Sequence, residues 1–229
     1  MAVGIIGAMQ EEVDLLITDL SDVKEYPIAN LIFFKGKLNS KEVVVVKSGA
    51  GKVNAAICTQ VLIDKFSVSK VIFTGVAGAL NKSLKIFDVV ISRETLQHDL
   101  DASSLGYARG QIPFSNLKNI KASEELVKLA LNCAKELKIN AILGLILTGD
   151  QFISDSKVNS DLIKCFGGDC VDMESAAVAY TCFVNEIPHV IVRSISDNAD
   201  GSAHKSFAEF LLVAAENSKK LVEKMVNKL

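Results

Sequence analysis

Short, almost continuous apolar runs alternate along the chain with longer stretches of helical periodicity. The runs are rich in valine and isoleucine and most end at a glycine, which is typical of buried strands covered by helices. The runs predict strands at Val3–Ile6, Val43–Lys47, Val71–Thr74, Asp88–Ser92, Ala141–Leu147, Cys170–Asp172 and Val190–Ser194, with Leu31–Lys35 as an amphipathic edge strand or hairpin partner. The periodic stretches predict helices at Glu11–Asp19, Lys52–Lys65, Ser123–Leu137, Ser156–Cys165, Glu174–Asn185 and Ser206–Val226.

The alternation of strands and helices predicts an α/β fold, and the composition indicates one domain. The chain has 229 residues, of which 49% are hydrophobic and only 3 are prolines. A chain of this length and composition can bury a large core, and it contains no linker-like stretch. We therefore expect a single domain over residues 1–229.

The net charge and the cysteine content indicate which kinds of partner and site this chain is expected to have. The formal net charge is −2 and the lysines are dispersed, so nothing supports a nucleic-acid partner, and a small-molecule substrate fits better. The 5 cysteines form no CxxC pair, which argues against a disulfide framework or a metal site. Without a secretory signal or an apolar run of membrane length, we expect a cytoplasmic protein with reduced thiols and no membrane partner.

Carboxylates follow three of the predicted strands. Ligands of open α/β sheets bind beyond the carboxyl ends of the strands, where Glu12, Glu174 and Asp197 stand. Each also has a structural interpretation, because acidic residues stabilise helix starts and Asp197 lies in a turn-forming Ser-Asp-Asn sequence. Three carboxylates that converge on one crevice nevertheless favour acid–base chemistry.

Other suggestive segments favour structural interpretations. The glycine-rich segment Ser48–Val53 lacks the first glycine and the final hydroxyl of a nucleotide-triphosphate loop, so it predicts a tight strand-to-helix turn. His98 lies beside Asp99 and Asp101, which favours an ion-pair cluster in a loop over a catalytic histidine.

Seven segments occur in order along the chain: GIIGAMQEEV, KSGAGKVNAA, TGVAGAL, GDQFI, VDMESAAVA, RSISDNAD and SFAEFL. Together they resemble the 5′-methylthioadenosine/S-adenosylhomocysteine nucleosidase family of the nucleoside phosphorylase superfamily, from residue 3 to the last helix. The resemblance implies a three-layer sandwich with a central mixed β-sheet flanked by helices. It also implies hydrolysis of the N-glycosidic bond of adenosine-type substrates, which would include 5′-deoxyadenosine, without a cofactor or metal.

The resemblance assigns roles to the three carboxylates. Glu12 matches a general base that activates the attacking water beside C1′ of the ribose. Asp197 matches an acid that protonates N7 of adenine, which requires a raised pKa of its carboxyl group. Glu174 matches a residue that binds the ribose hydroxyls. Its negative charge would stabilise the positive charge that develops on the ribose in the transition state.

The same resemblance implies a substrate pocket. Phe152 would stack on adenine, the backbone of Ile153 would read the base edge, and Arg193 would help to organise Glu12 and the water. The full set of implied substrate-binding residues is Ala8, Met9, Ala50, Val76, Ala77, Gly78, Phe152, Ile153, Asp172, Met173, Arg193, Ser196 and Phe207. In a homodimer, Leu105 and Pro113 of the partner subunit would cap the 5′ group.

Three alternatives stay open. A purine nucleoside phosphorylase would carry an arginine where this chain has Phe73, and the acidic Glu12 would repel a phosphate dianion. Futalosine or aminodeoxyfutalosine hydrolysis uses the same chemistry. Ala50, Ala102 and Leu105 stand where the family pattern leads us to expect bulkier residues, which leaves the 5′ preference open. A non-enzymatic ligand-binding module is the alternative of a different class, and the intact carboxylates argue against it.

Overall fold

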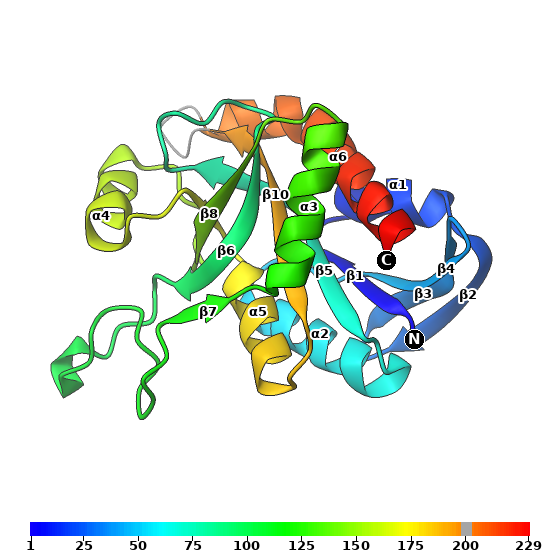
Figure 1. Cartoon of the computed structure of the whole chain (residues 1–229). Helices are drawn as coiled ribbons and strands as arrows, with labels where there is room; N and C mark the ends of the chain where they lie inside the picture. The colour runs from blue at the N-terminus through cyan, green and yellow to red at the C-terminus, as the bar shows by residue number, and fades with distance from the viewer. Residues whose placement is uncertain (198–202) are drawn as a thin grey trace.

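The structure, a computed structural model, describes residues 1–197 and 203–229, without the side chains of residues 203–209 (Figure 1). Its strands are β1 (Val3–Gly7), β2 (Ser21–Ile28), β3 (Leu31–Leu38), β4 (Lys41–Lys47), β5 (Lys70–Ala79), β6 (Val89–Gln97), β7 (Asn119–Lys121), β8 (Ala141–Thr148), β9 (Cys170–Asp172) and β10 (His189–Asp197). Its helices are α1 (Gln10–Thr18), α2 (Lys52–Phe66), the 3-10 turn η1 (Ser103–Leu105), α3 (Glu124–Glu136), α4 (Ser156–Phe166), α5 (Ser175–Val184) and α6 (Ala203–Lys228).

Strand β5 is central in the sheet and pairs with three other strands. It pairs in parallel with β1 and β10, and its last residues pair antiparallel with β9. Strand β10 also pairs antiparallel with β6, β6 runs parallel to β8, and β8 runs parallel to β9. Strands β5, β10, β6, β8 and β9 therefore close on themselves, while β1, β4, β3 and β2 continue as an open sheet. The predicted mixed sheet is confirmed.

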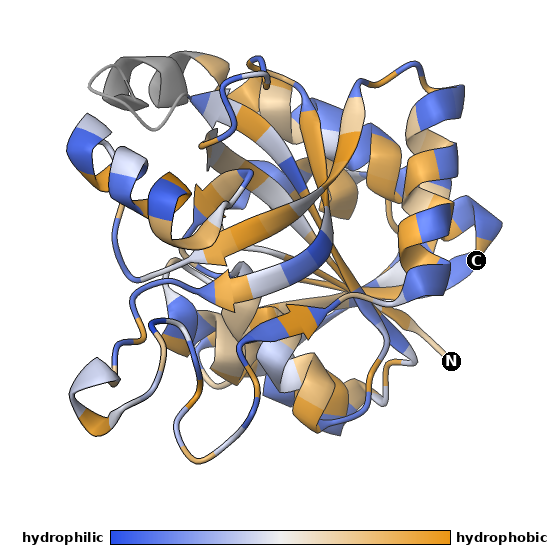
Figure 2. Ribbon diagram, turned by 60° about the vertical axis from the view of Figure 1, so that its left-hand side comes forward, coloured by the Kyte–Doolittle hydropathy of each residue, from blue (hydrophilic) through white to orange (hydrophobic). Residues whose placement is uncertain are grey.

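Helices cover both faces of this sheet, so the predicted three-layer sandwich is confirmed. On one face, Leu62 of α2 and Val178 of α5 belong to one buried cluster. On the other face, Leu16 of α1, Leu126 of α3 and Val222 of α6 belong to a second. Figure 2 shows hydrophobic residues along the strands and hydrophilic residues on the outer sides of the helices. Burial of apolar area on both faces is the main force that holds the layers together.

Two strands lie where the sequence predicts none. Strand β2 is exposed along nearly its whole length and pairs with β3 at the edge of the sheet. An edge strand with both faces in solvent needs no apolar alternation, so it leaves no hydrophobic pattern to detect. Strand β7 has 3 residues and is too short to show a pattern.

Two strands continue beyond the ends predicted for them at Thr74 and Ser194. Strand β5 continues through Gly75–Gly78 to Ala79, and β10 continues through Ser196 to Asp197 with an irregularity after Ile195. Glycines in a sequence resemble strand ends, but an extended glycine also allows another group to approach the backbone closely. None of the helices in the described segments is long and apolar enough to cross a membrane.

Candidate active site

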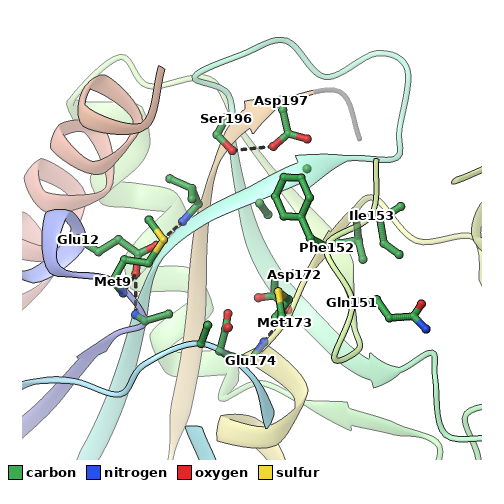
Figure 3. Close-up of a pocket in the computed structure, with 16 residues that line it drawn as sticks. Met9, Glu12, Gln151, Phe152, Ile153, Asp172, Met173, Glu174, Ser196 and Asp197 are labelled. Carbon is green, nitrogen blue, oxygen red and sulfur yellow. Dashed lines mark hydrogen bonds between the residues drawn. The ribbon is translucent and has the colours of Figure 1, made fainter. Parts of the chain in front are cut away.

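A pocket opens where β1, β5, β9 and β10 end, beside the segment that follows β8 (Figure 3). Figure 3 shows Glu12, Glu174 and Asp197 on three sides of this pocket, each from a different part of the fold. The lining residues are Ala8, Met9, Glu12, Ala50, Val76, Ala77, Gly78, Gln151, Phe152, Ile153, Val171, Asp172, Met173, Glu174, Ser196 and Asp197.

Glu12 lies in the first turn of α1, where backbone N–H groups hold its carboxylate. Its Oε2 accepts hydrogen bonds from Ala8 N at 2.6 Å and Met9 N at 2.9 Å, and its Oε1 accepts one from Val76 N at 3.1 Å. The helix-start interpretation of Glu12 is therefore correct, and the same carboxylate also faces the pocket. A carboxylate offers about four acceptor positions, so these bonds leave Oε1 able to accept from a water.

Burial dominates the electrostatics of Glu12. It raises the pKa of the Glu12 carboxyl above its usual range, although the charge of Arg193 and the backbone hydrogen bonds act in the opposite direction. A carboxylate with a raised pKa binds a proton more readily, which is the property required of a general base.

Arg193 is fully buried behind the carboxylates. Its Nε donates to Asp172 Oδ2 at 2.7 Å, and its Nη1 donates to the Thr74 carbonyl at 3.2 Å. The guanidinium carbon lies 3.9 Å from the centre of the Phe73 ring, and Nη2 lies 3.7 Å from Glu174 Oε2. Several partners thus fix the cation in one orientation beside the pocket.

Gly75 is the point where Arg193 and Glu12 approach the backbone of β5. A Cβ atom at Gly75 would collide with Nη1 of Arg193 and with the carboxylate of Glu12. Only glycine leaves room for both groups at this position. This requirement explains a glycine in the middle of a buried strand.

Asp172 lines the pocket, but protein donors already engage both of its oxygens. Its Oδ1 accepts from the Thr148 hydroxyl at 2.7 Å and from Ser175 N at 3.2 Å. Its Oδ2 accepts from Arg193 Nε at 2.7 Å and from the Ser175 hydroxyl. Asp172 therefore joins β8, the start of α5 and Arg193, which is a buried and well-satisfied network.

Glu174 is the residue immediately before α5, and its Oε1 accepts a hydrogen bond from Gly51 N at 2.8 Å. Burial raises the pKa of Glu174 to about 7, and the carboxylates of Asp172 and Glu12 act in the same direction. The Arg193 charge and the Gly51 hydrogen bond oppose that shift. Near neutral pH, Glu174 therefore populates both its protonated and its ionised forms.

Asp197 closes the pocket from the end of β10. It is buried, and its Oδ1 accepts a hydrogen bond from the Ser196 hydroxyl at 2.8 Å. The register irregularity between Ile195 and Asp197 lies directly before it. Such irregularities redirect side chains at the ends of strands, and Figure 3 shows the Asp197 carboxyl facing the pocket from above.

The remaining wall is largely apolar. Ile153 is buried in a cluster with Leu162 of α4 and Val171 of β9. Phe152 is 43% exposed and its ring faces the pocket in Figure 3, where Met9 and Met173 also lie. An exposed aromatic ring beside three carboxylates suits a flat ligand that also carries polar groups.

Most of the predicted site residues come together in this pocket. Arg193 does not line it and lies directly behind it, and Leu105 and Pro113 lie in the segment between β6 and β7, away from the pocket of their own chain. The side chain of Phe207 is outside the described part of the structure. Across residues 1–197 and 210–229, the side chains form no cluster of three or more metal-ligating residues.

Two lining residues and one backbone contact were not predicted from the sequence. Gln151 and Val171 line the pocket, and both stand next to predicted site residues in the segments GDQFI and VDMES. Gly51 holds Glu174 through its backbone N–H, which no side-chain pattern reveals. For Gln151 and Val171, the available signal was their position next to predicted site residues at the end of a strand.

Comparisons with known proteins agree with this geometry. The family model of the Phosphorylase superfamily matches residues 2–227. A curated 5′-methylthioadenosine/S-adenosylhomocysteine nucleosidase of Exiguobacterium sp. is 46% identical over 231 residues, covering 100% of this chain and 99% of the relative.

Solved structures are similar over the same length. The nucleosidase of that name from Neisseria meningitidis, in complex with methylthio-immucillin-A, has a TM-score of 0.97 and 40% identity, covering 100% of this chain and 99% of the other. A futalosine hydrolase of Helicobacter pylori strain 26695 has a TM-score of 0.96 and 40% identity, covering 100% and 98%.

Proposed function

The chain belongs to the phosphorylase superfamily, and from this membership we propose that it is a nucleosidase acting on 5′-methylthioadenosine and S-adenosylhomocysteine. It hydrolyses the N-glycosidic bond and releases adenine and the 5-substituted ribose. The observation that carries this proposal is the meeting of Glu12, Glu174 and Asp197 around one pocket with an apolar wall. The similar nucleosidases named above support the choice of substrate.

The reaction divides between the two ends of the pocket. Asp197 donates a proton to N7 of adenine, so that the base leaves as a neutral molecule while positive charge develops on the ribose. Glu12 takes a proton from the water whose oxygen bonds to C1′. Ionised Glu174 binds the ribose hydroxyls and stabilises the oxocarbenium-like transition state through its charge. Water supplies the hydroxyl group, and no cofactor is required.

Water, rather than phosphate, is the nucleophile. Four carboxylates, Glu12, Asp172, Glu174 and Asp197, line the pocket, and neither lysine nor arginine lines it among the described side chains. Arg193 lies behind the pocket, and Asp172 and the Thr74 carbonyl already occupy two of its donors. A phosphate dianion would be repelled by the carboxylates without a clamp to offset that repulsion.

Adenine release is therefore expected to proceed at the same rate with and without inorganic phosphate. The test incubates the purified protein with 5′-methylthioadenosine in phosphate-free buffer and follows adenine and sugar products by chromatography. The expected products are adenine and 5-methylthioribose in equal amounts. Strict phosphate dependence, or a ribose 1-phosphate product, would contradict both the hydrolytic mechanism and the assignment of Glu12.

A futalosine hydrolase is also similar to this chain, so the comparisons are compatible with more than one 5′ group on the substrate. Ala50 is a small residue that lines the pocket, and it leaves room for a larger substituent on the ribose. Comparison of kcat/KM for methylthioadenosine, S-adenosylhomocysteine and aminodeoxyfutalosine ranks these substrates. A higher kcat/KM for aminodeoxyfutalosine than for the other two substrates would identify the chain as a futalosine-type hydrolase with the same carboxylate chemistry.

We further propose a homodimer in which residues 101–114 of one subunit complete the pocket of the other. Leu105 is 69% exposed and Phe114 is 91% exposed in this segment. Helices α2 and α5 pack together, and Val53 and Ile57 of α2 and Phe183 of α5 are exposed. Both helices and residues 101–114 lie in the lower part of Figure 1. Such a collection of exposed apolar residues is typical of an interface between subunits.

Replacing Leu105 with aspartate is expected to weaken the dimer and to raise KM for methylthioadenosine by about tenfold or more, because a charge would enter an apolar contact. Sedimentation velocity at the assay concentration measures the oligomeric state. Ile32→Asp, which alters an exposed apolar residue of the distant β3, is the matched control and should change neither quantity. A fully active wild-type monomer would refute the shared pocket.

The cellular setting follows from the substrate and the thiols. All 5 cysteines are free, which agrees with a reducing compartment, and we propose a cytoplasmic location. Because the reaction removes methylthioadenosine and releases methylthioribose, we propose that it serves methionine salvage.

A further inference from the structure

We propose that Asp99 and Lys52, which do not line the pocket, are positioning residues that hold the adenine-binding segment 149–153 in place. The inference rests on the proposed function, because it assigns Phe152 and Ile153 to the base. It adds two charged residues behind the pocket to the machinery of the reaction.

Asp99 and Lys52 take part in a closed ring of hydrogen bonds. Lys52 Nζ donates to Asp99 Oδ1 at 2.7 Å, and Asp99 Oδ2 accepts from Asp150 N at 2.9 Å. Asp150 Oδ1 in turn accepts from Lys52 N at 2.7 Å. Each residue of the ring contacts both others, so that the start of α2, the segment after β6 and the segment after β8 are joined.

This ring connects the base side of the pocket to its ribose side. Asp150 directly precedes Gln151 and Phe152, which line the pocket. Lys52 directly follows Gly51, whose N–H donates to Glu174 Oε1 at 2.8 Å. The Gly51–Glu174 hydrogen bond does not itself involve Asp99, so loss of the Asp99 side chain is expected to act first on segment 149–153.

The negative charge of Asp99 offsets the unfavourable position of the Lys52 cation at the start of a helix. Lys52 is the first residue of α2, where the helix dipole disfavours a cation. Asp99 compensates for this, and both side chains are only 19% exposed, which makes the pair stronger than a surface ion pair. Although burial acts to raise the pKa of Asp99, the hydrogen bonds from Lys52 and Asp150 hold it below its usual range. Asp99 is therefore ionised at neutral pH.

The packing at Gly149 supports the same interpretation. A Cβ atom at Gly149 would collide with the His98 imidazole and approach the carboxyl carbon of Asp99. Residues 98 and 99 therefore fill the space behind segment 149–153, and the ring fixes the segment against them. His98 itself is buried and forms no ion pair with the described residues, so the ion pair in this loop joins Asp99 to Lys52 and not to His98.

The primary test measures adenine affinity and steady-state kinetics for Asp99→Ala. Removing hydrogen bonds to a charged group is expected to raise both the Kd for adenine and the KM for methylthioadenosine about tenfold, with a smaller change in kcat. The rate with p-nitrophenyl riboside, which has no adenine, should stay near that of the wild type. Asp99→Asn retains an acceptor for Asp150 N and should recover part of the affinity.

Two further variants keep the test informative if Asp99→Ala folds poorly. Lys52→Met retains the apolar part of the side chain and should raise the adenine Kd in the same direction. Glu125→Ala breaks the Lys70–Glu125 pair on α3, far from the pocket, and should leave Kd and KM unchanged.

Amide hydrogen exchange gives a readout that does not depend on activity. The Asp150 N–H, which donates to Asp99, should exchange faster in Asp99→Ala than in the wild type. Unchanged exchange together with unchanged adenine Kd and KM would overturn the positioning role. An equal loss of rate for methylthioadenosine and p-nitrophenyl riboside would also overturn it. Failure of the wild type to release adenine would instead refute the proposed function.

Discussion

Asp197→Asn is expected to lower kcat for methylthioadenosine by about 10³-fold, while much of the rate for p-nitrophenyl riboside is retained. Adenine leaves readily only when N7 is protonated, and the carboxamide of an asparagine has no acidic proton to give. Nitrophenolate is a stable anion that departs without protonation. Steady-state assays of both substrates under the same conditions separate leaving-group protonation from every other role of Asp197.

Glu12→Gln is the matched variant and should lose activity with both substrates, because each reaction needs an activated water. The amide nitrogen of the introduced glutamine cannot accept a hydrogen bond, so Val76 N or the pair of Ala8 N and Met9 N loses its acceptor. Circular dichroism and size-exclusion chromatography check that both variants are folded. An equal loss for the two substrates in Asp197→Asn would show that Asp197 does not act as the acid.

Replacing Glu174 with glutamine is expected to increase the free energy of unfolding by about 3 kcal/mol at pH 8 while activity is largely lost. The folded-state pKa is about 7 and the ordinary value is 4.5. The folded protein therefore binds more protons than the unfolded chain between these values, so Glu174 lowers stability progressively as pH rises through that range. Each pKa unit corresponds to about 1.4 kcal/mol, which gives the expected gain.

At pH 4 the two proteins should be nearly equal in stability, because Glu174 is then largely protonated in both the folded and the unfolded states and resembles glutamine. Urea denaturation at pH 4 and pH 8 measures the difference. Cys170→Ser, another buried change beside the same network, should show no comparable dependence on pH in this range. A Glu174→Gln protein that is less stable at pH 8 would show that the charge of Glu174 is well accommodated.

The sequence predicted the buried strands because their apolar residues form nearly continuous runs that no other element produces as easily. Edge strand β2 left no such signal, since solvent covers both of its faces. Strand ends were predicted too early in β5 because Gly75 resembles a breaker. Its real role, to make space for Glu12 and Arg193, depends on residues far away in sequence.

The carboxylates were predicted to meet, and they do, although the geometry differs from that of a simple open sheet. Strand β9 runs antiparallel to β5, and in a flat sheet its carboxyl end would point to the opposite edge. The pairing of Gly78 with Val171 brings the end of β9 beside the end of β5. This closure depends on tertiary packing. The position of Glu174 after a predicted strand pointed to it in the sequence, and the family resemblance supplied its role.

The backbone hydrogen bonds of Glu12 separate the position of the base from the shape of the pocket. Ala8, Met9 and Val76 shape the pocket with their side chains, but they hold the carboxylate with their N–H groups. Substitutions at these positions can reshape the substrate cavity without removing a donor to the base, with proline as the exception. Substrate preference can therefore change in evolution through the side chains of Ala8, Met9 and Val76, while their N–H groups continue to hold Glu12 in place.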